Sequence, residues 1–162
     1  MNDACSAPDG RGAGWVVAQF ALLAAVLAAG PSWRGHWPGW PAPVSGAALL
    51  ALGAWLGVRG VRDLGRHRTP FPRPRPDAEL VTTGIYARLR HPLYAAVIVL
   101  GLAWALLWRS WPALVLAVVQ VPFFDAKARA EERRLRERFP GYVDYARRVG
   151  RFLPRRRGRF CA

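Results

Sequence analysis

The chain has 162 residues, enough for a single domain, and its composition is unusual for a soluble one. Hydrophobic residues make up 52% of it, while 24 Lys and Arg against 10 Asp and Glu give a formal net charge of +14. These values argue against a soluble globular domain. The charge and the hydrophobicity must instead occupy different stretches of the chain.

Four apolar runs, nearly free of charged residues, lie between basic stretches. They cover residues 14–30, 42–61, 93–108 and 111–124. The first two approach the roughly 20 residues that a bilayer crossing needs, and the last two are shorter. We therefore predict an all-α fold, a multi-span transmembrane helical bundle of about four spans, in which the last two runs form either full spans or a tight hairpin.

The arginines predict the orientation, because cytoplasmic loops of membrane proteins are rich in Lys and Arg. Loop 62–91 holds seven arginines and the tail after Lys127 is more basic still, whereas connections 31–41 and 109–110 hold one each. Tryptophans, which favour the membrane interface, fall at the opposite ends of the runs. These are Trp33, Trp37, Trp40, Trp108 and Trp111. We expect a multi-pass protein of the inner, cytoplasmic membrane whose active site faces the cytoplasm.

Residues 84–94, Gly-Ile-Tyr-Ala-Arg-Leu-Arg-His-Pro-Leu-Tyr, run from a basic loop directly into the third apolar run. Pro92 suits the first turn of a helix, where its missing N–H costs no hydrogen bond. Arg90, His91 and Tyr94 then lie at the mouth of a span, where ionisable groups are costly and mark functional sites. The start of this helix can also hold an anionic group. The simpler alternative is that His91 only caps the helix or packs against it.

Glu131 and Glu132 are an acidic pair inside a segment that is otherwise almost wholly basic. At helical spacing, Lys127 shares one face with Glu131, and Glu132 shares another with Arg136. The pair can therefore form ordinary ion pairs on a solvated helix, each worth a few tenths of a kcal/mol. It can also supply a carboxylate to a binding site, and the sequence alone leaves both interpretations open.

The motif Gly-x-Tyr-x-x-x-Arg-His-Pro-x-Tyr at 84–94, with Glu-Glu-x-x-Leu-x-x-x-Phe at 131–139, resembles the isoprenylcysteine carboxyl methyltransferase and phospholipid methyltransferase family of integral membrane enzymes. The resemblance covers residues 78–154. It implies S-adenosyl-L-methionine as cofactor, bound by the segment before the glycine turn, the tyrosine of that turn, the His-Pro-x-Tyr stretch and the first glutamate. In this chain those residues are Ala78, Glu79, Leu80, Val81, Tyr86, His91, Pro92, Leu93, Tyr94 and Glu131.

The same resemblance implies that an acceptor carboxylate meets Lys127, with Arg129 nearby, where the prenylcysteine enzymes have an arginine. Lysine keeps the charge but lacks the two-pronged guanidinium. We expect methyl transfer to a lipophilic acceptor that enters from the bilayer, above all the carboxylate of a prenylcysteine-like substrate, with His91 and Arg90 as catalytic residues. A carboxylate needs no general base, whereas an amine needs one, which His91 or a glutamate can supply.

On this interpretation residues 1–61 form an N-terminal pair of transmembrane helices. Residues 62–162 form the catalytic region, with a cofactor loop, a helical hairpin over 92–124 and cytoplasmic C-terminal helices. The interpretation requires that the arginine-rich loop and the acidic pair beyond the fourth run fold toward each other and enclose a pocket. Tyr94 must then lie close to Glu131.

Three alternatives remain open: a phospholipid amine N-methyltransferase, an NADPH-dependent membrane sterol-type reductase, and a non-catalytic basic membrane protein that binds anionic lipid. The reductases resemble the Arg-His-Pro-x-Tyr stretch but have an Asn before the Tyr, so Leu93 and the acidic pair favour methyl transfer. The sequence contains no zinc-ligand spacing and no Gly-rich phosphate loop. The partners we expect are membrane lipids and a lipophilic or lipidated substrate, with no metal and no nucleic acid.

Overall fold

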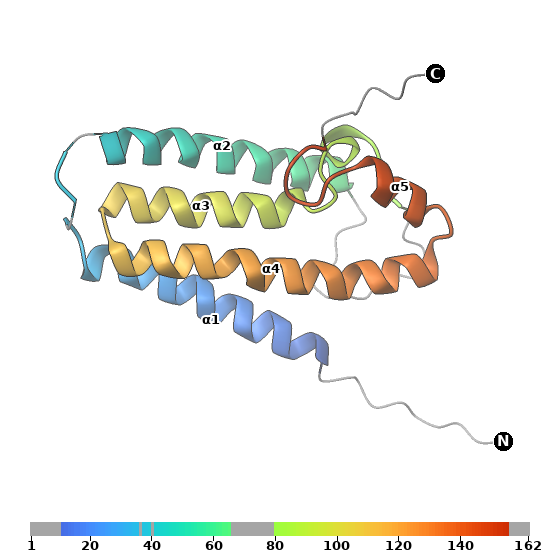
Figure 1. Cartoon of the computed structure of the whole chain (residues 1–162), viewed down its shortest axis with the longest axis horizontal. Helices are drawn as coiled ribbons and strands as arrows, with labels where there is room; N and C mark the ends of the chain where they lie inside the picture. The colour runs from blue at the N-terminus through green and yellow to red at the C-terminus, as the bar shows by residue number, and fades with distance from the viewer. Residues whose placement is uncertain (1–10, 36, 40, 66–79, 156–162) are drawn as a thin grey trace.

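The computed structural model of the chain describes residues 11–35, 37–39, 41–65 and 80–155. These residues form α-helices and a short 3₁₀ turn, without any strand in the described part (Figure 1). The helices are α1 (Arg11–Ser32), α2 (Pro41–Leu64), α3 (Pro92–Trp108), α4 (Trp111–Arg138) and α5 (Tyr142–Arg148), and the turn is η2 (Gly84–Ala87). The predicted all-α fold is confirmed.

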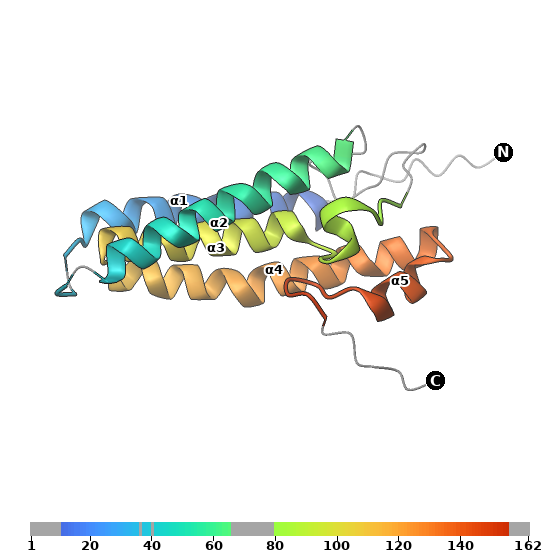
Figure 2. The same cartoon turned by 90° about the horizontal axis from the view of Figure 1, so that it is seen from above.

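Three of these helices are long and apolar enough to cross a membrane, namely Ala13–Ser32 of α1, all of α2 and all of α4. The fourth, α3, is apolar but has 17 residues, which is about 25 Å at a rise of about 1.5 Å per residue. A bilayer core is about 30 Å thick, so α3 lies at the short limit for a span. The predicted helical bundle is confirmed, with three helices that could span a membrane by length and composition, and Figure 2 shows α3 running beside α4.

Glycines bring α2 close to α3. A Cβ atom on Gly53 would come 2.7 Å from Leu100 Cγ, and one on Gly60 would come 2.8 Å from Leu93 Cδ2. Small residues at a membrane helix interface let the two backbones approach and pack tightly. The loop that follows α2 is therefore anchored next to the start of α3.

The first helix, α1, packs against α4 and α3, so that the helices follow one another in Figure 1 in the order α2, α3, α4, α1. The Ser110 hydroxyl donates to Ala29 O at 2.9 Å, and the Trp104 indole donates to Leu27 O at 3.2 Å. The first two helices thus make their main contacts with α3 and α4, not with each other. The division of the chain at residue 61 stays a prediction.

The turn η2 is held between α2 and α5. Gly84 has φ +60°, and a Cβ atom there would collide with the Asp63 carboxylate. That carboxylate accepts a hydrogen bond from Ile85 N at 2.7 Å. The Tyr145 hydroxyl donates to Tyr86 O at 2.7 Å. The loop that enters α3 is therefore fixed at both sides.

Candidate active site

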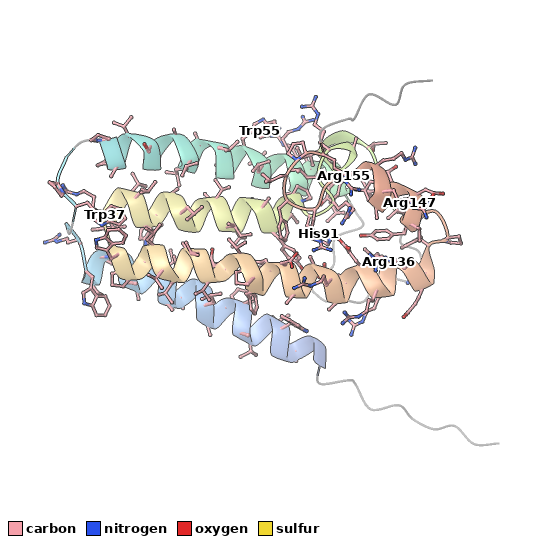
Figure 3. The ribbon with its side chains drawn as sticks, in the orientation of Figure 1. Trp37, Trp55, His91, Arg136, Arg147 and Arg155 are labelled. Carbon is pink, nitrogen blue, oxygen red and sulfur yellow. The ribbon has the colours of Figure 1, made fainter. Side chains whose placement is uncertain are left out.

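The start of α3 is held by the last described segment of the chain. Leu89 and Gly150 form a short parallel pairing, in which Arg90 N donates to Gly150 O at 2.8 Å and His91 N donates to Arg151 O at 3.1 Å. The His91 side chain makes no capping hydrogen bond to α3. It is instead buried and points toward α4 (Figure 3). His91 is therefore the N-cap residue of α3 by position, while its side chain is free of any capping role.

His91, Tyr94 and Glu131 form the first of two polar clusters at this junction. The His91 and Tyr94 rings stack, with centroids 5.4 Å apart and 3° between their planes. The Tyr94 hydroxyl donates to Glu131 Oε1 at 2.5 Å, and Glu131 Oε2 lies 3.7 Å from His91 Nδ1. The His91 side chain is 8% exposed and that of Glu131 is 24% exposed, so the carboxylate is the accessible part. The loop before α3 and the acidic stretch of α4 thus meet directly.

Lys127 joins this cluster from one turn earlier on the same face of α4. It is 5% exposed, and its ammonium nitrogen lies 5.3 Å from the centroid of the Tyr94 ring, within cation–π distance. The same nitrogen donates to Gln19 Oε1 of α1 at 2.5 Å. The Phe124 ring packs against Tyr94, with centroids 5.0 Å apart. The first cluster therefore combines a carboxylate, an ammonium group and aromatic faces.

Arg129 lies outside the first cluster. It follows Lys127 by two residues, which places it roughly 200° around the helix. Its side chain is 57% exposed and pairs with Asp125 at 2.8 Å. Of the two residues expected to meet the substrate, the structure brings Lys127 to the Tyr94 ring and leaves Arg129 on another face of α4.

The second cluster is centred on Glu132, whose side chain is 1% exposed. Arg90 donates to Glu132 Oε1 through Nε at 3.1 Å and Nη2 at 2.9 Å, and Arg151 donates to the two carboxylate oxygens at 3.0 Å each. Arg151 also pairs with Asp125. Hydrogen bonds between arginine and carboxylate are charge-assisted, and they offset the cost of burying the charge.

Arg90 also binds the end of α5. Its Nη1 donates to Ala146 O at 2.7 Å and to Val149 O at 2.5 Å. Carbonyl groups at a helix C-terminus lack partners within the helix and attract a cation. All three guanidinium nitrogens therefore bind protein groups, and the geometry makes Arg90 a link between α3, α4 and α5. A part in catalysis stays a prediction for this residue.

His91 lies between the two clusters. Its Nε2 is 3.3 Å from Glu132 Oε1, and its Nδ1 is 3.7 Å from Glu131 Oε2. Phe152 packs edge-on against the imidazole, with centroids 6.3 Å apart. Glu132 is itself held by three arginines, because Arg136 Nη2 also donates to its Oε2 at 3.4 Å as the i, i+4 spacing predicted, and it contacts the imidazole from the Nε2 side. The other ring nitrogen then faces the accessible Glu131 carboxylate.

Tyr86, the tyrosine of the glycine turn, is buried beside the first cluster. Its hydroxyl donates to Gly60 O at 3.4 Å. Burial raises the pKa of Tyr86 to about 12, and the negative charges of Asp63 and Glu131 add to this rise. The hydroxyl therefore stays protonated at neutral pH and acts as a hydrogen-bond donor.

Four further residues predicted to bind the cofactor are apolar and lie in packing contacts. Leu93 contacts α2, and Pro92 is buried in the first turn of α3. Leu80 packs against the buried side chains of α5, and Val81 packs against those of η2 and α2. Two more, Ala78 and Glu79, lie outside the described residues. Among the residues that are described, no three His, Cys, Asp or Glu side chains could hold a metal ion together.

Sequence reasoning missed three residues of the two clusters: Gln19, Asp125 and Arg151. Gln19 is the one polar residue within the apolar run 14–30, and Asp125 directly follows the run 111–124. Polar residues inside or at the edge of a membrane span often mark a functional site, and this rule could have identified both Gln19 and Asp125. Arg151 has no such signal, because it is one arginine among many in a basic tail.

The chain matches a sequence model of the phospholipid methyltransferase family over residues 42–141. It is 35% identical over 144 residues to a nickel-cobalt-cadmium resistance protein of Alcaligenes xylosoxydans xylosoxydans, covering 87% of this chain and 63% of the relative. A cobalt-zinc-cadmium resistance protein of Cupriavidus metallidurans gives the same identity over 144 residues, with 87% and 62% covered.

A third relative is protein-S-isoprenylcysteine O-methyltransferase B of Arabidopsis thaliana, 30% identical over 128 residues, with 76% of this chain and 64% of the relative covered. The chain thus spans less than two thirds of the length of each of these relatives. The family model extends from α2 to the start of α5 and includes Tyr94, Glu131 and Glu132. The chain therefore belongs to the phospholipid methyltransferase family of membrane methyltransferases.

Proposed function

We propose that this protein transfers a methyl group from S-adenosyl-L-methionine to a lipophilic acceptor in the membrane. The observation that carries the proposal is the contact between Tyr94 and Glu131, which joins the first turn of α3 to α4 at 2.5 Å. A stacked imidazole and a buried ammonium group lie at the same place. Ionisable groups beside apolar membrane helices are costly and mark functional sites.

The chemistry of the first cluster fits a sulfonium nucleotide. The partly exposed Glu131 carboxylate can accept hydrogen bonds from an ammonium group and from ribose hydroxyls. The rings of Tyr86 and Tyr94 can offer aromatic faces to a cation. The chemistry that S-adenosyl-L-methionine would supply is an electrophilic methyl group on a positively charged sulfur. The role of Glu132 is to hold the His91 ring beside this carboxylate.

Lys127 makes an anionic acceptor the best match. A carboxylate next to its buried ammonium would gain a charge-assisted hydrogen bond. A carboxylate oxygen can attack a methyl group without losing a proton, so proximity and exclusion of water can supply the rate. We therefore propose the carboxylate of a prenylcysteine-like substrate as acceptor. Arg129, which is exposed and paired with Asp125, has no direct part in this scheme.

A phospholipid amine is the second candidate, because the matching family is described by that substrate class. An amine must lose a proton during transfer, and His91, with Nδ1 3.7 Å from Glu131, is placed to accept one. The methylated amine would carry a positive charge close to Lys127, and like charges repel. The carboxylate acceptor therefore ranks first.

We further propose a multi-pass arrangement in the cytoplasmic membrane, with both polar clusters on the cytoplasmic side. The end of the molecule that carries η2 and α5 is the arginine-rich one, as the labelled Arg136, Arg147 and Arg155 illustrate in Figure 3. The opposite end carries tryptophans, among them Trp37, whose ring packs on Trp111 with centroids 4.7 Å apart. Basic loops stay in the cytoplasm, and tryptophans favour the interface.

Cofactor binding tests the proposal directly. The purified chain in lipid nanodiscs is titrated with S-adenosyl-L-methionine by calorimetry, and Glu131→Ala and His91→Ala should each weaken binding by at least about tenfold. Glu137→Ala, an exposed glutamate on the same helix, is the matched control and should bind normally. Unchanged binding in both site variants would remove the site assignment.

A second experiment separates the alternatives. Membranes that contain the protein are incubated with an isotopically labelled methyl donor, and the lipid products are identified by mass. A labelled methyl ester supports a carboxylate acceptor, and a labelled methylamine supports a phospholipid acceptor. Binding of NADPH in place of the methyl donor would favour a reductase, and binding of neither would favour a lipid-binding protein.

A further inference from the structure

Gln19 reaches the site from a helix that lies outside the residues matched by the family model, 42–141. Its Oε1 accepts a hydrogen bond from Lys127 Nζ at 2.5 Å. A polar side chain within an apolar membrane helix is costly unless it finds a partner. Here that partner is the buried ammonium group of the first cluster.

Lys127 carries a positive charge, but its direct partners are neutral groups, which bind an ammonium less strongly than a carboxylate does. Its ammonium lies over the Tyr94 ring and donates to a neutral amide. Within the described residues no carboxylate lies within ion-pair distance of it, although the Glu131 charge attracts it from one turn along α4. A hydrogen bond from an ammonium to a carboxylate is roughly twice as strong as one between neutral groups, and low polarity strengthens it further. An anionic group placed beside this ammonium would therefore displace the amide.

The N-terminal half of α1 is placed to release the amide toward the bilayer. Besides the bond to Lys127, the ring contact that joins this half to α4 is between Trp15 and Phe123, with centroids 5.5 Å apart. The neighbouring side chains of Val17 and Phe20 are 68% and 62% exposed, so they face lipid in a membrane. Figure 1 shows α1 diverging from α4 toward its first residues.

We propose that Gln19 occupies the acceptor subsite on Lys127 in the free protein and must leave it before the acceptor can bind. In the free protein its amide occupies the position of the acceptor's anionic head group, and an anionic amphiphile from the bilayer displaces it from Lys127. The inference rests on the proposed function and narrows the acceptor to lipophiles with an anionic head. It also assigns the side between α1 and α4 as the side of entry.

Two probes with the same tail test this exchange. N-acetyl-S-farnesylcysteine has an anionic head and its methyl ester a neutral one, and binding of each to the full chain in nanodiscs is measured. The wild-type protein should bind the acid at least about tenfold more tightly than the ester. Gln19→Glu should abolish this preference, because a carboxylate on α1 then pairs with Lys127. Gln19→Leu should keep the preference and bind the acid more tightly than the wild type.

The matched control is Trp15→Leu, which changes a neighbouring contact of the same helix and should leave the preference unchanged. Absence of the preference in the wild type, its survival in Gln19→Glu or its loss in Gln19→Leu would each overturn the inference. If Gln19→Glu does not fold, Lys127→Gln takes its place, and retention of the preference there overturns the inference equally.

Binding of S-adenosyl-L-methionine to the same samples separates this inference from the proposed function. A wild-type protein that binds no S-adenosyl-L-methionine overturns the proposed function. Normal cofactor binding together with an unchanged acid preference in Gln19→Glu overturns only the role of Gln19.

Discussion

The Arg90 guanidinium donates two hydrogen bonds to one oxygen of Glu132, although 42 residues separate them in sequence. Arg151 binds both oxygens of the same carboxylate. One buried negative charge therefore joins the start of α3, the later turns of α4 and the segment after α5. These contacts support the backbone that presents His91 and Glu131, so the geometry of the candidate site depends on charge pairing.

Removal of the Glu132 charge should destabilise this end of the molecule. Glu132→Gln leaves the partly buried Arg90 without its carboxylate partner and Arg151 with Asp125 alone. Breaking one partner of a buried ion pair costs about 3–5 kcal/mol, and the remaining bond to Asp125 lowers that cost. We expect a large fall in the thermal unfolding midpoint of the purified protein. Glu137→Gln, on an exposed position of the same helix, should change it little. Equal midpoints for the two variants would contradict the structural role of Glu132.

The Tyr94 hydroxyl should matter for cofactor affinity more than for stability. Tyr94→Phe keeps the ring that stacks on His91 but removes the donor to Glu131. A hydrogen bond to a charged group contributes about 1.5–3 kcal/mol, so affinity for S-adenosyl-L-methionine should fall roughly ten- to a hundredfold. Tyr94→Leu, which also loses the ring, should bind still more weakly. Calorimetric titration that finds wild-type affinity in Tyr94→Phe would show that the hydroxyl does not orient Glu131.

Gly84 should not tolerate a side chain. Gly84→Ala puts a Cβ atom at φ +60° and against the Asp63 carboxylate, which costs about 1–2 kcal/mol for the backbone alone. The bond from Ile85 N to Asp63 should be lost, and with it the position of η2. Gly141→Ala is the control, because its Cβ meets nothing within 4 Å and its φ is −76°. Unfolding midpoints should separate the two variants clearly, and similar values would refute this account.

Gln120 offers a stabilising substitution. It is fully buried against Gly101, and in the described structure neither atom of its amide has a hydrogen-bond partner. An unsatisfied buried polar group costs about 1–3 kcal/mol. Gln120→Met keeps the length of the side chain and removes the amide, so the unfolding midpoint should rise. Leu116→Met, one turn earlier, is a comparable swap without a polar group and should be nearly neutral. A lower midpoint for Gln120→Met would point to a partner that the amide needs.

Tyr86 should make the free energy of unfolding depend on pH in the alkaline range. Burial, with the charges of Asp63 and Glu131, raises the pKa of Tyr86 from 10.0 to about 12. The folded protein thus holds this proton more tightly than the unfolded chain, so the resulting stability is complete below pH 10 and is lost as the pH rises through 12. Burial also raises the pKa of Tyr142 and Tyr145, so the contribution of Tyr86 is measured against Tyr86→Phe. The unfolding midpoint of that variant should fall less steeply with pH, and parallel profiles would contradict the prediction.

The helices of this protein could be predicted because each apolar run is long and is bounded by basic or proline-rich residues. The apolar run 93–108 became α3, which begins at Pro92 as expected. The helix α4 continues past its apolar run and ends at Arg138. The charged residues at i, i+4 spacing after Asp125 predict this continuation. Local sequence carries these signals, because helix formation depends on neighbours along the chain.

The candidate site could be predicted only where the residues lie in a motif. Tyr94 and Glu131 are in such motifs, and the structure brings them together. The assignment of Arg90 beside Tyr94 followed from their closeness in sequence, yet the Arg90 side chain faces Glu132 and α5. Arg151 reaches the same carboxylate from beyond α5. Contacts of this kind depend on tertiary folding, which spacing along one helix does not encode.

The pairing of Leu89 with Gly150 gives the protein an order of assembly during translation. Helices α1 to α4 leave the ribosome first and can enter the membrane while the tail is still being made. The amide of His91 finds its acceptor, Arg151 O, only after the segment that follows α5 has been synthesised. A chain truncated after α5 would therefore lack the contacts that hold His91 in the candidate site.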